Sequence, residues 1–263
     1  MSNQPSPNSL SLPPETFGLG APVSIHPGGQ SLRMGVIILV IGLVITCGAL
    51  VMYFTVGVPQ ILAIGAPITA LVGGIITVQG FLQRGRKAVV FADAVAEIKS
   101  GKANIIRWDD VVSVWQSITV TKMYGVVETG RRYFYTVQAK DGRRLVFGNA
   151  YKNVEALGKA IQQAVTTRLM PRYLETYNSG GTVKFGSLTL SKAGLSNGKE
   201  TIPWNQVEQV TINRGTITVR RAGKWLGWTS QTAAGTPNLF IFLTMIDQIV
   251  GLNKPKKQPP ATG

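Results

Sequence analysis

The sequence has little of the residues on which most enzyme sites depend. Among its 263 residues it has one cysteine, Cys47, and one histidine, His26. Single residues of each kind exclude a disulfide and a Cys/His zinc site, and they leave Ser–His and Cys–His catalysis without its usual partners. We therefore expect no catalytic residues, no metal site and no cofactor.

Motifs of nucleotide binding and hydrolysis are also missing or out of context. The sequence has neither a P-loop nor a dinucleotide-binding glycine motif after a strand. "GLSNG" (194–198) matches the nucleophile-elbow pattern, but it falls in a predicted turn between strands, and no histidine is available to activate Ser196. Asp109 and Asp110 are adjacent in a predicted turn, where their side chains diverge. The sequence favours a binding protein over an enzyme.

Charge is absent from one long stretch. Residues 34–83 contain no Asp, Glu, Lys, Arg or His. The apolar segments 34–54 and 61–82 are each near the roughly 20 residues that a helix needs to cross a bilayer, and neither has a polar face. The sequence predicts a two-helix transmembrane hairpin over residues 33–83. Small residues that would let the two helices pack closely are Gly65, Ala66, Ala70, Gly73 and Gly74.

Basic residues predict the orientation of this hairpin. Only Arg33 precedes it, whereas Arg84, Arg86 and Lys87 follow it at once. Because positive charge collects on the cytoplasmic side, both ends of the hairpin are expected there. The prediction is a multi-pass protein of the bacterial inner (plasma) membrane, with its N-terminus and C-terminal domains in the cytoplasm.

Acidic residues are scarce after the hairpin. The formal net charge is +15, and all acidic residues except Glu15 and all Lys and Arg residues except Arg33 follow Gln83. A basic domain close to a bilayer is attracted to anionic lipid headgroups, which we expect as partners. Nucleic acid ranks below lipid because the basic residues lack a clustered aromatic stacking motif.

The chain falls into five segments. Residues 1–32 are rich in Pro, Ser and Gly and predict a disordered tail before the hairpin. Short strands dominate from residue 86. About seven antiparallel strands are expected before the helix that begins near Val154, with turns at 128–130 and at Asp141–Gly142. A basic flexible tail is expected at 253–263. The predicted segments are 1–32, 33–83, 84–178, 179–252 and 253–263.

Helical periodicity closes each half of the strand-rich region. Val154, Leu157, Ile161, Val165 and Leu169 form one apolar stripe, and Pro171 predicts a break or kink in that helix. Strands resume after Gly180–Gly181. A second helix is expected near residue 236, with Thr236 as N-cap and Pro237 at its first position.

An internal repeat links the two halves. Trp108, Val111 and Val114 match Trp204, Val207 and Val210 at a constant offset of 96 residues. Each set lies between short strands and is followed by further strands and one helix. This pattern predicts one strand-rich fold used twice, with the tryptophans and valines as packing residues.

The repeated segments resemble a known family. "VVFADAV", "RWDDVVSVW" and "NVEALGKAI" in the first copy, with "VKFGSLTLSKAGL", "IPWNQVEQV" and "PNLFIFL" in the second, resemble a bacterial family of uncharacterised membrane proteins with tandem pleckstrin-homology-like (PH-like) domains. The resemblance covers residues 86–252. It implies an α+β, mainly β, soluble part of two tandem PH-like half-barrels, each plugged by its C-terminal helix, and binding or scaffolding in place of catalysis.

Basic residues at three places are candidates for binding. The first follows the hairpin, where anchoring of the helix end is the alternative interpretation. The second comprises two arginine pairs at opposite ends of one predicted strand, which could instead be solvated surface charges. The third combines tryptophan with basic residues, although both tryptophans could belong to the second core. The candidates are Arg84, Arg86, Lys87, Arg131, Arg132, Arg143, Arg144, Arg220, Arg221, Lys224, Trp225 and Trp228.

The function expected from these features is non-catalytic. We expect a membrane-anchored binding or scaffold protein whose basic PH-like domains contact anionic lipid headgroups or a protein partner at the membrane. The alternative is an accessory or assembly subunit of a larger integral membrane complex.

Overall fold

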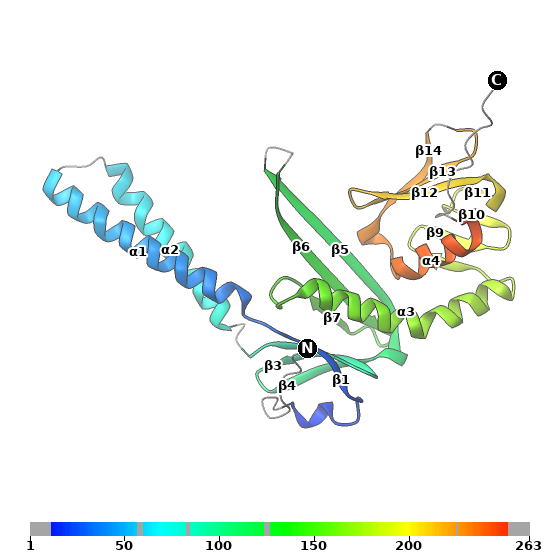
Figure 1. Cartoon of the computed structure of the whole chain (residues 1–263), viewed down its shortest axis with the longest axis horizontal. Coiled ribbons are helices and arrows are strands. Elements are labelled where there is room, and N and C mark those ends of the chain that lie inside the picture. The colour runs from blue at the N-terminus through cyan, green and yellow to red at the C-terminus, as the bar shows by residue number, and fades with distance from the viewer. Residues whose placement is uncertain (1–11, 57–59, 83–84, 124–126, 225, 252–263) are drawn as a thin grey trace, which may run out of the picture. The chain divides into compact units, whose positions relative to one another are not determined.

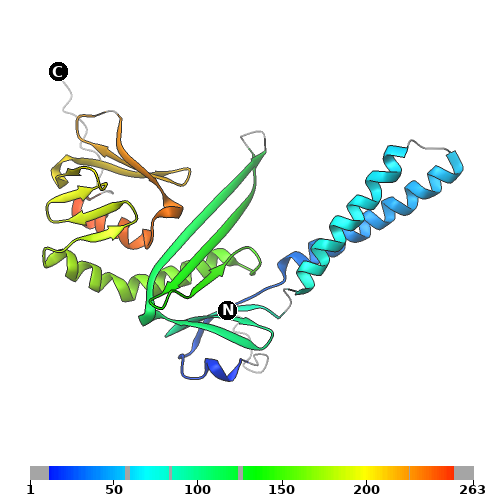
Figure 2. The ribbon, with the colours of Figure 1, turned by 180° about the vertical axis from the view of Figure 1, so that it is seen from behind.

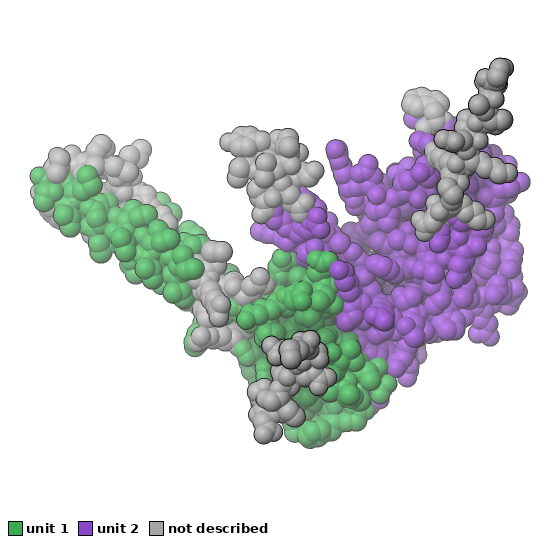
Figure 3. Space-filling view, in the orientation of Figure 1, with its two compact units in different colours: residues 1–105, 147–157 green, residues 106–146, 158–263 purple. Residues whose placement is uncertain are grey.

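The computed structural model describes residues 12–56, 60–82, 85–123, 127–224 and 226–251. Within its helices and strands, it does not describe the side chains of residues 30–34, 50, 53, 54, 56, 60–67, 69, 82, 121–123 and 127–129. The chain divides into two compact units (Figure 3). Unit 1 consists of residues 1–105 and 147–157, and unit 2 consists of residues 106–146 and 158–263. Each unit therefore takes its residues from two separate stretches of the chain.

Unit 1 is built on an antiparallel sheet with the strand order β1-β2-β3-β4. Its strands are β1 (Pro22–Pro27), β2 (Lys87–Phe91), β3 (Ala94–Lys99) and β4 (Lys102–Arg107), of which the last two residues belong to unit 2. Ile25 of β1 pairs with Val89 of β2 and packs against the same buried cluster, which also contains Leu19. The expectation of a disordered tail over residues 1–32 therefore does not hold for β1 or for the short 3-10 helix Pro14–Thr16.

Helices α1 (Gln30–Val56) and α2 (Gln60–Leu82) lie between β1 and β2 in the chain and pack on each other as a hairpin (Figure 1, Figure 2). Their backbones approach closely at two glycines. A Cβ atom at Gly73 would lie 2.4 Å from Leu39 N, and one at Gly35 would lie 2.6 Å from Thr77 N. A Cβ at Gly74 would meet nothing closer than 3.9 Å. Close packing through small residues is thus observed at Gly73 and not at its neighbour.

The membrane prediction for this hairpin requires correction. A helix that crosses a bilayer needs about 20 consecutive apolar residues. Over the residues that the structure describes, no helix is both long and apolar enough to meet this requirement. This finding contradicts the predicted transmembrane hairpin of residues 33–83 and the multi-pass location in the bacterial inner membrane that followed from it. The described chain has an α+β architecture of four antiparallel sheets and four α-helices.

Unit 2 begins with a three-stranded sheet of order β5-β6-β7. Its strands are β5 (Val111–Met123), β6 (Val127–Ala139) and β7 (Arg144–Phe147, whose last residue belongs to unit 1). The turn expected at 128–130 is part of β6, where Gly130 pairs with Thr121. The turn at Asp141–Gly142 joins β6 to β7 as predicted. One face of this sheet is covered by helix α3 (Val154–Asn178), as both ribbon views show (Figure 1, Figure 2).

Helix α3 is continuous through Pro171, where the sequence predicted a break or kink, so no break occurs there. A proline inside a helix loses one backbone hydrogen bond. Packing on both sides of the proline compensates: Leu169, Tyr173 and Leu174 contact the core of the second copy, and Tyr177 is buried in it. Near the N-terminal end of α3, the ring of Tyr135 lies against Gly158. A Cβ at Gly158 would lie 1.9 Å from Tyr135 Cζ.

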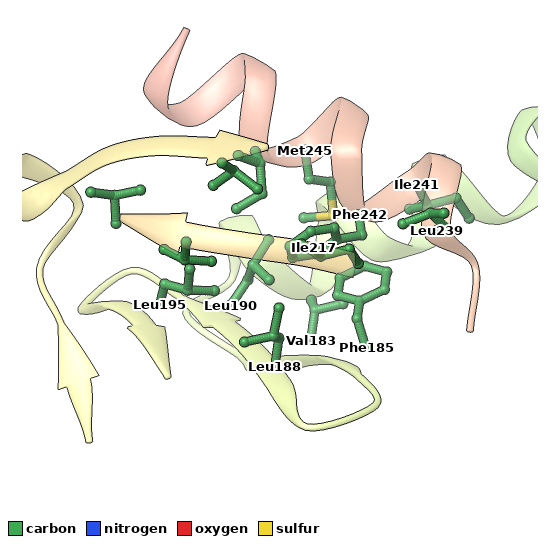
Figure 4. Packing of buried hydrophobic residues seen from close by; sticks show 14 of the residues in the cluster. Val183, Phe185, Leu188, Leu190, Leu195, Ile217, Leu239, Ile241, Phe242 and Met245 are labelled. Carbon is green, nitrogen blue, oxygen red and sulfur yellow. The ribbon is translucent and has the colours of Figure 1, made fainter. Parts of the chain in front are cut away.

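The second copy has a four-stranded sheet, a three-stranded sheet and helix α4 around one core (Figure 4). Side chains of Phe185, Leu190 and Ile217 from the strands meet Phe242 and Met245 of α4. The elements are β8 (Val183–Phe185), β9 (Leu188–Ser191), β10 (Gly194–Ser196), β11 (Thr201–Ile202), β12 (Val207–Asn213), β13 (Thr216–Arg221), β14 (Gly227–Thr232) and α4 (Leu239–Val250).

The start of α4 lies two residues after the predicted position. Thr236 follows a short 3-10 helix, Ala233–Gly235, and Asn238 with a φ of 51° precedes the first helical residue. Asn238 attaches this segment to β5. Its Oδ1 accepts from Val114 N at 2.9 Å, its Nδ2 donates to Val112 O at 3.1 Å, and its own N–H donates to Val114 O at 2.8 Å. Tertiary pairing, which helix-start preferences do not capture, therefore decides where α4 begins.

Apart from the α1–α2 hairpin between β1 and β2 and the 3-10 helix Ala233–Gly235 before α4, both copies have the same order of elements along the chain. A four-stranded sheet is followed by a one-turn 3-10 helix that starts with a tryptophan, then a three-stranded sheet and one helix. The repeated valines are buried, Trp108 is buried, and Trp204 is half-buried with its Nε1 donating to Ser191 O at 2.8 Å. The residue before each helix is an asparagine with positive φ, Asn153 or Asn238. The resemblance to tandem PH-like domains, and the domain boundary at residue 178, stay predictions.

Candidate binding surface

Of the basic residues that follow the hairpin, Arg86 belongs to a polar cluster with Tyr151 and Glu97 in unit 1. Arg84 lies outside the described residues. Lys87 begins β2, and Arg86 precedes it with its carbonyl accepting from Gly28 N at 2.7 Å. Its Nε is buried and has no hydrogen-bond partner in the part of the chain that the structure describes. Part of the Arg86 guanidinium is therefore shielded from solvent.

Tyr151 and Glu97 lie at the centre of this polar cluster. The hydroxyl of Tyr151 donates to Glu97 Oε1 at 2.5 Å. Burial raises the pKa of Tyr151 well above its usual range, the bond to Glu97 raises it further, and the charge of Arg86 acts in the opposite direction. The hydroxyl therefore stays protonated at neutral pH and acts as a structural donor.

The second-copy candidates are largely committed to an internal network. Arg221 Nη1 lies 3.0 Å from Glu200 Oε1, and its Nε donates to Gln206 Oε1 at 2.8 Å. Trp228 packs against the second core and donates from Nε1 to Glu200 Oε2 at 3.0 Å. Arg220 is half-buried and Lys224 is exposed, while Trp225 lies outside the described residues. Glu200 thus holds Arg221 and Trp228 in place, whereas Lys224 stays exposed, and an interfacial role of this loop stays a prediction.

The first-copy arginines separate into two pairs. Arg131 and Arg132 lie in the middle of β6, and Arg132 is about 23 Å from the end of that strand at 3.3 Å per residue. Arg143 follows the turn and pairs with Asp141, with Nε to Oδ2 at 2.6 Å. The backbone N–H of Arg143 also donates to Asp141 Oδ1, and this bond, followed by the side-chain bond, lowers the pKa of Asp141. Arg143 is therefore partly neutralised.

One face of the β5–β7 sheet combines aromatic and basic side chains. Opposite residues of an antiparallel pair point to the same side of the sheet. Ser117 pairs with Phe134 and Thr119 pairs with Arg132, whereas Tyr133 and Tyr135, on either side of Phe134 in the chain, are buried on the side of α3. We call the opposite side the outer β5–β7 face. Its aromatic, apolar and basic members are Trp115, Arg132, Phe134, Arg144 and Val146.

The outer β5–β7 face is exposed in its apolar as well as its basic part. Phe134 is 46% exposed and Val146 is 53% exposed. The guanidinium of Arg144 lies 5.8 Å from the centre of the Trp115 ring, within the range of a cation–π contact. An exposed phenylalanine and a half-buried tryptophan beside arginines are typical of surfaces that bind partners.

Sequence reasoning identified only part of this face. It named Arg132 and Arg144 but missed Trp115, Phe134 and Val146. The alternation in "RRYFYTVQA" (131–139) carries the signal, because Phe134 falls on the opposite side from Tyr133 and Tyr135. Which side would be buried depends on α3, which follows later in the chain.

The described residues show no constellation typical of catalysis. No group of three or more His, Cys, Asp or Glu side chains lies close enough together to hold a metal ion in the described part of the chain. Ser196 of the "GLSNG" segment lies in β10, where its Oγ donates to Glu200 O at 3.2 Å and accepts from Gly198 N at 3.2 Å. Its hydroxyl serves a turn between two strands.

Comparison with known proteins places the chain in a family without giving it an activity. A family model described as a family of unknown function (DUF6585) matches residues 13–255. The chain belongs to this family. A search of curated proteins found no match. The match begins before β1 and continues through α4, so the strand that precedes the hairpin lies within the family's common region.

Proposed function

We propose that the protein is a non-catalytic binding protein and that its outer β5–β7 face contacts anionic lipid headgroups at a membrane surface. The observation that supports this proposal is the presence of Trp115 and Phe134 beside Arg132 and Arg144 on one exposed sheet face. Amphipathic aromatic rings and basic side chains are what peripheral contact with a lipid interface requires. Such contact needs no membrane-spanning helix.

Electrostatics supports an anionic partner. The chain carries a formal net charge of +15. Each basic residue close to an anionic surface contributes about 1 kcal/mol of attraction, which weakens with salt. Arg144 is held over Trp115 and is therefore kept at the same place as the apolar part of the face. A protein partner with an acidic surface is the competing occupant.

Vesicle co-sedimentation of the full chain tests the proposal. The full chain is required because a fragment that begins after the hairpin would lack β1 and leave the edge of β2 unpaired. We expect binding to phosphatidylcholine vesicles that contain phosphatidylglycerol, no binding to pure phosphatidylcholine, and a loss with rising salt. Arg132→Gln and Phe134→Ser should each weaken binding about fivefold.

Matched controls come from exposed residues outside this face. Lys199→Gln removes an exposed charge in the turn between β10 and β11, and Ile212→Ser removes an apolar side chain that is 44% exposed, close to the value for Phe134. Neither should change binding. Absence of vesicle binding even at low salt would refute the lipid proposal and leave the face to a protein partner.

A second candidate function is an assembly role, in which the hairpin packs on helices of a larger complex. It is favoured by the apolar side chains that α1 and α2 leave exposed, including Val44 at 67% and Leu71 at 64%. Site-specific crosslinkers at these two positions in intact cells should then capture a partner. Capture at neither position, with the crosslinker shown to react, would argue against this role.

A further inference from the structure

Unit 2 contains a groove of about 300 Å³ between helix α3, the beginning of β8 and the first residues of β5. We call it the α3–β8 groove. Its polar lining comes from Arg172, Tyr173 and Thr176 of α3 and from Thr182 and Lys184 at β8. The volume corresponds to the lower end of the range for small-molecule sites. None of these residues belongs to the outer β5–β7 face.

The side chains reach the groove for local reasons. Arg172 and Thr176 are four residues apart on α3 and therefore lie on the same side of the helix. Thr182 and Lys184 are two residues apart, so both point away from the core, into which Val183 turns with 5% exposure. Helix and strand thus present their polar side chains to the same space.

The lining is cationic. Arg172 and Lys184 both line the groove, and no acidic residue does. Neither side chain has an ion-pair or hydrogen-bond partner among the residues that the structure describes. One turn earlier on α3, by contrast, Arg168 Nη1 lies 3.7 Å from Asp109 Oδ1. The positive charge of the groove is therefore not offset by an acidic residue of its lining.

Tyr173 provides an oriented hydroxyl donor. Asn238 donates from Nδ2 to Val112 O, and its Oδ1 accepts from Val114 N, so its amide group can have only one orientation. The same Nδ2 donates to the hydroxyl oxygen of Tyr173 at 2.8 Å. The Tyr173 oxygen is held as an acceptor, and its own O–H is left to donate. Thr182 adds a second hydroxyl.

We propose that the α3–β8 groove binds a phosphate group, as a phosphomonoester or phosphodiester of a small ligand. A guanidinium, an ammonium and two hydroxyl donors match the several acceptor oxygens of phosphate, and charge-assisted hydrogen bonds are the strongest of their kind. A soluble phosphate ester and the headgroup of a phospholipid share this chemistry. The inference does not require the outer β5–β7 face to bind lipid.

Titration calorimetry of the full chain with glycerol 3-phosphate at constant ionic strength tests the groove. We expect saturable binding, and no binding of glycerol. Arg172→Gln and Lys184→Gln should each lower the affinity about tenfold, the effect of losing one hydrogen bond to a charged group. Lys199→Gln, an exposed charge outside the groove, should leave the affinity unchanged.

Two results would overturn the proposal. One is the absence of saturable glycerol 3-phosphate binding by the wild-type chain. The other is an equal affinity of the wild type, Arg172→Gln and Lys184→Gln, with each variant shown to be folded by its circular dichroism spectrum and unfolding transition. Both residues are exposed, so their replacement should leave the fold intact.

A vesicle arm separates the two sources of phosphate. If phosphatidylglycerol vesicles compete with glycerol 3-phosphate and Arg172→Gln weakens vesicle binding, the groove takes lipid headgroups. If vesicles do not compete, it takes a soluble ester; either result supports the groove. Arg132→Gln tests the outer β5–β7 face in the same assay. A loss of vesicle binding with Arg132→Gln alone would support the proposed function and assign the groove to a soluble ester, whereas glycerol 3-phosphate binding that Arg172→Gln and Lys184→Gln leave unchanged would refute the groove.

Discussion

The three-stranded sheets of the two copies differ most on the side turned away from their helices. In the first copy this side carries Trp115, Phe134 and arginines. At the equivalent side of the second copy, Thr211, Thr218 and Ser230 stand next to each other across β12, β13 and β14. The buried valines that follow the repeated tryptophans are common to both sheets. The shared residues serve packing, and the candidate binding chemistry is found where the copies differ.

The helices of the two copies differ in length. Helix α3 has 25 residues and helix α4 has 12. Leu157 and Ile161 of α3, and Phe242 and Ile246 of α4, occupy the same positions counted from the preceding asparagine, and all are buried. The additional turns of α3 pack on the core of the second copy. One helix therefore contributes to both copies, so we do not expect the second copy to be stable without α3.

Replacement of the asparagine before each helix should show the largest difference in stability between the two copies. Asn238→Ala is expected to lower the free energy of unfolding by about 3 kcal/mol, because three side-chain hydrogen bonds are lost and alanine disfavours positive φ. Asn238→Gly should cost about 2 kcal/mol, since glycine tolerates that backbone. Asn153 is exposed, and Asn153→Ala should cost about 1 kcal/mol. Urea unfolding measures all three; equal losses at Asn153 and Asn238 would contradict the attachment to β5.

Helix packing provides the next comparison. The first copy places Tyr135 against Gly158, and the positions that correspond to them in the second copy hold Ile217 and Leu243. Gly158→Ala should destabilise the protein by about 2 kcal/mol through overpacking, although glycine to alanine in an open helix stabilises by about 1 kcal/mol. Adding Tyr135→Ile should restore part of the loss in thermal unfolding. A double variant less stable than Gly158→Ala alone would show that the ring is not the obstacle.

Alkaline pH should lower the free energy of unfolding through the ionisation of Tyr151. Burial and Glu97 raise the pKa of this hydroxyl in the folded protein above its ordinary value of 10.0, so the unfolded chain releases the proton first. Its contribution to stability is present in full below pH 10 and is lost as the pH rises toward the folded-state pKa. Tyr151→Phe should flatten the decline in unfolding free energy above pH 10. A decline of equal slope in the variant would assign the effect to other groups. One of these is Tyr177, whose pKa is also raised by burial.

The smallest effects are expected from ion pairs. The side chains of Arg221 and Glu200 are 34% and 52% exposed, and those of Arg143 and Asp141 are 60% and 51% exposed. Glu200→Gln should cost about 1 kcal/mol or less, because it weakens a partly screened pair and a bond to Trp228. Asp141→Asn should have a smaller effect still. Unfolding at low and high salt measures both, and a larger loss for Asp141→Asn would reverse the ranking by exposure.

Local sequence signals determined much of the fold by themselves. The offset of 96 residues between Trp108 and Trp204 indicated the repeat, and the apolar stripe that begins at Val154 indicated α3. The pattern inside each copy and the apolar stripe are both local, and for local patterns periodicity and turn chemistry are sufficient. The same reasoning was wrong for the transmembrane hairpin, which no described helix supports.

Pairing between distant segments was decided only by the tertiary structure. Ile25 joins Val89 across the helical hairpin, and Asn238 attaches α4 to β5. The convergence of Arg172 and Lys184 in one groove, and the exposure of Phe134, depend on which faces α3 covers. The physical reason is that burial and strand pairing depend on contacts between residues far apart in the chain. The sequence by itself determined the repeated elements, and tertiary packing decided which side chains they leave for binding.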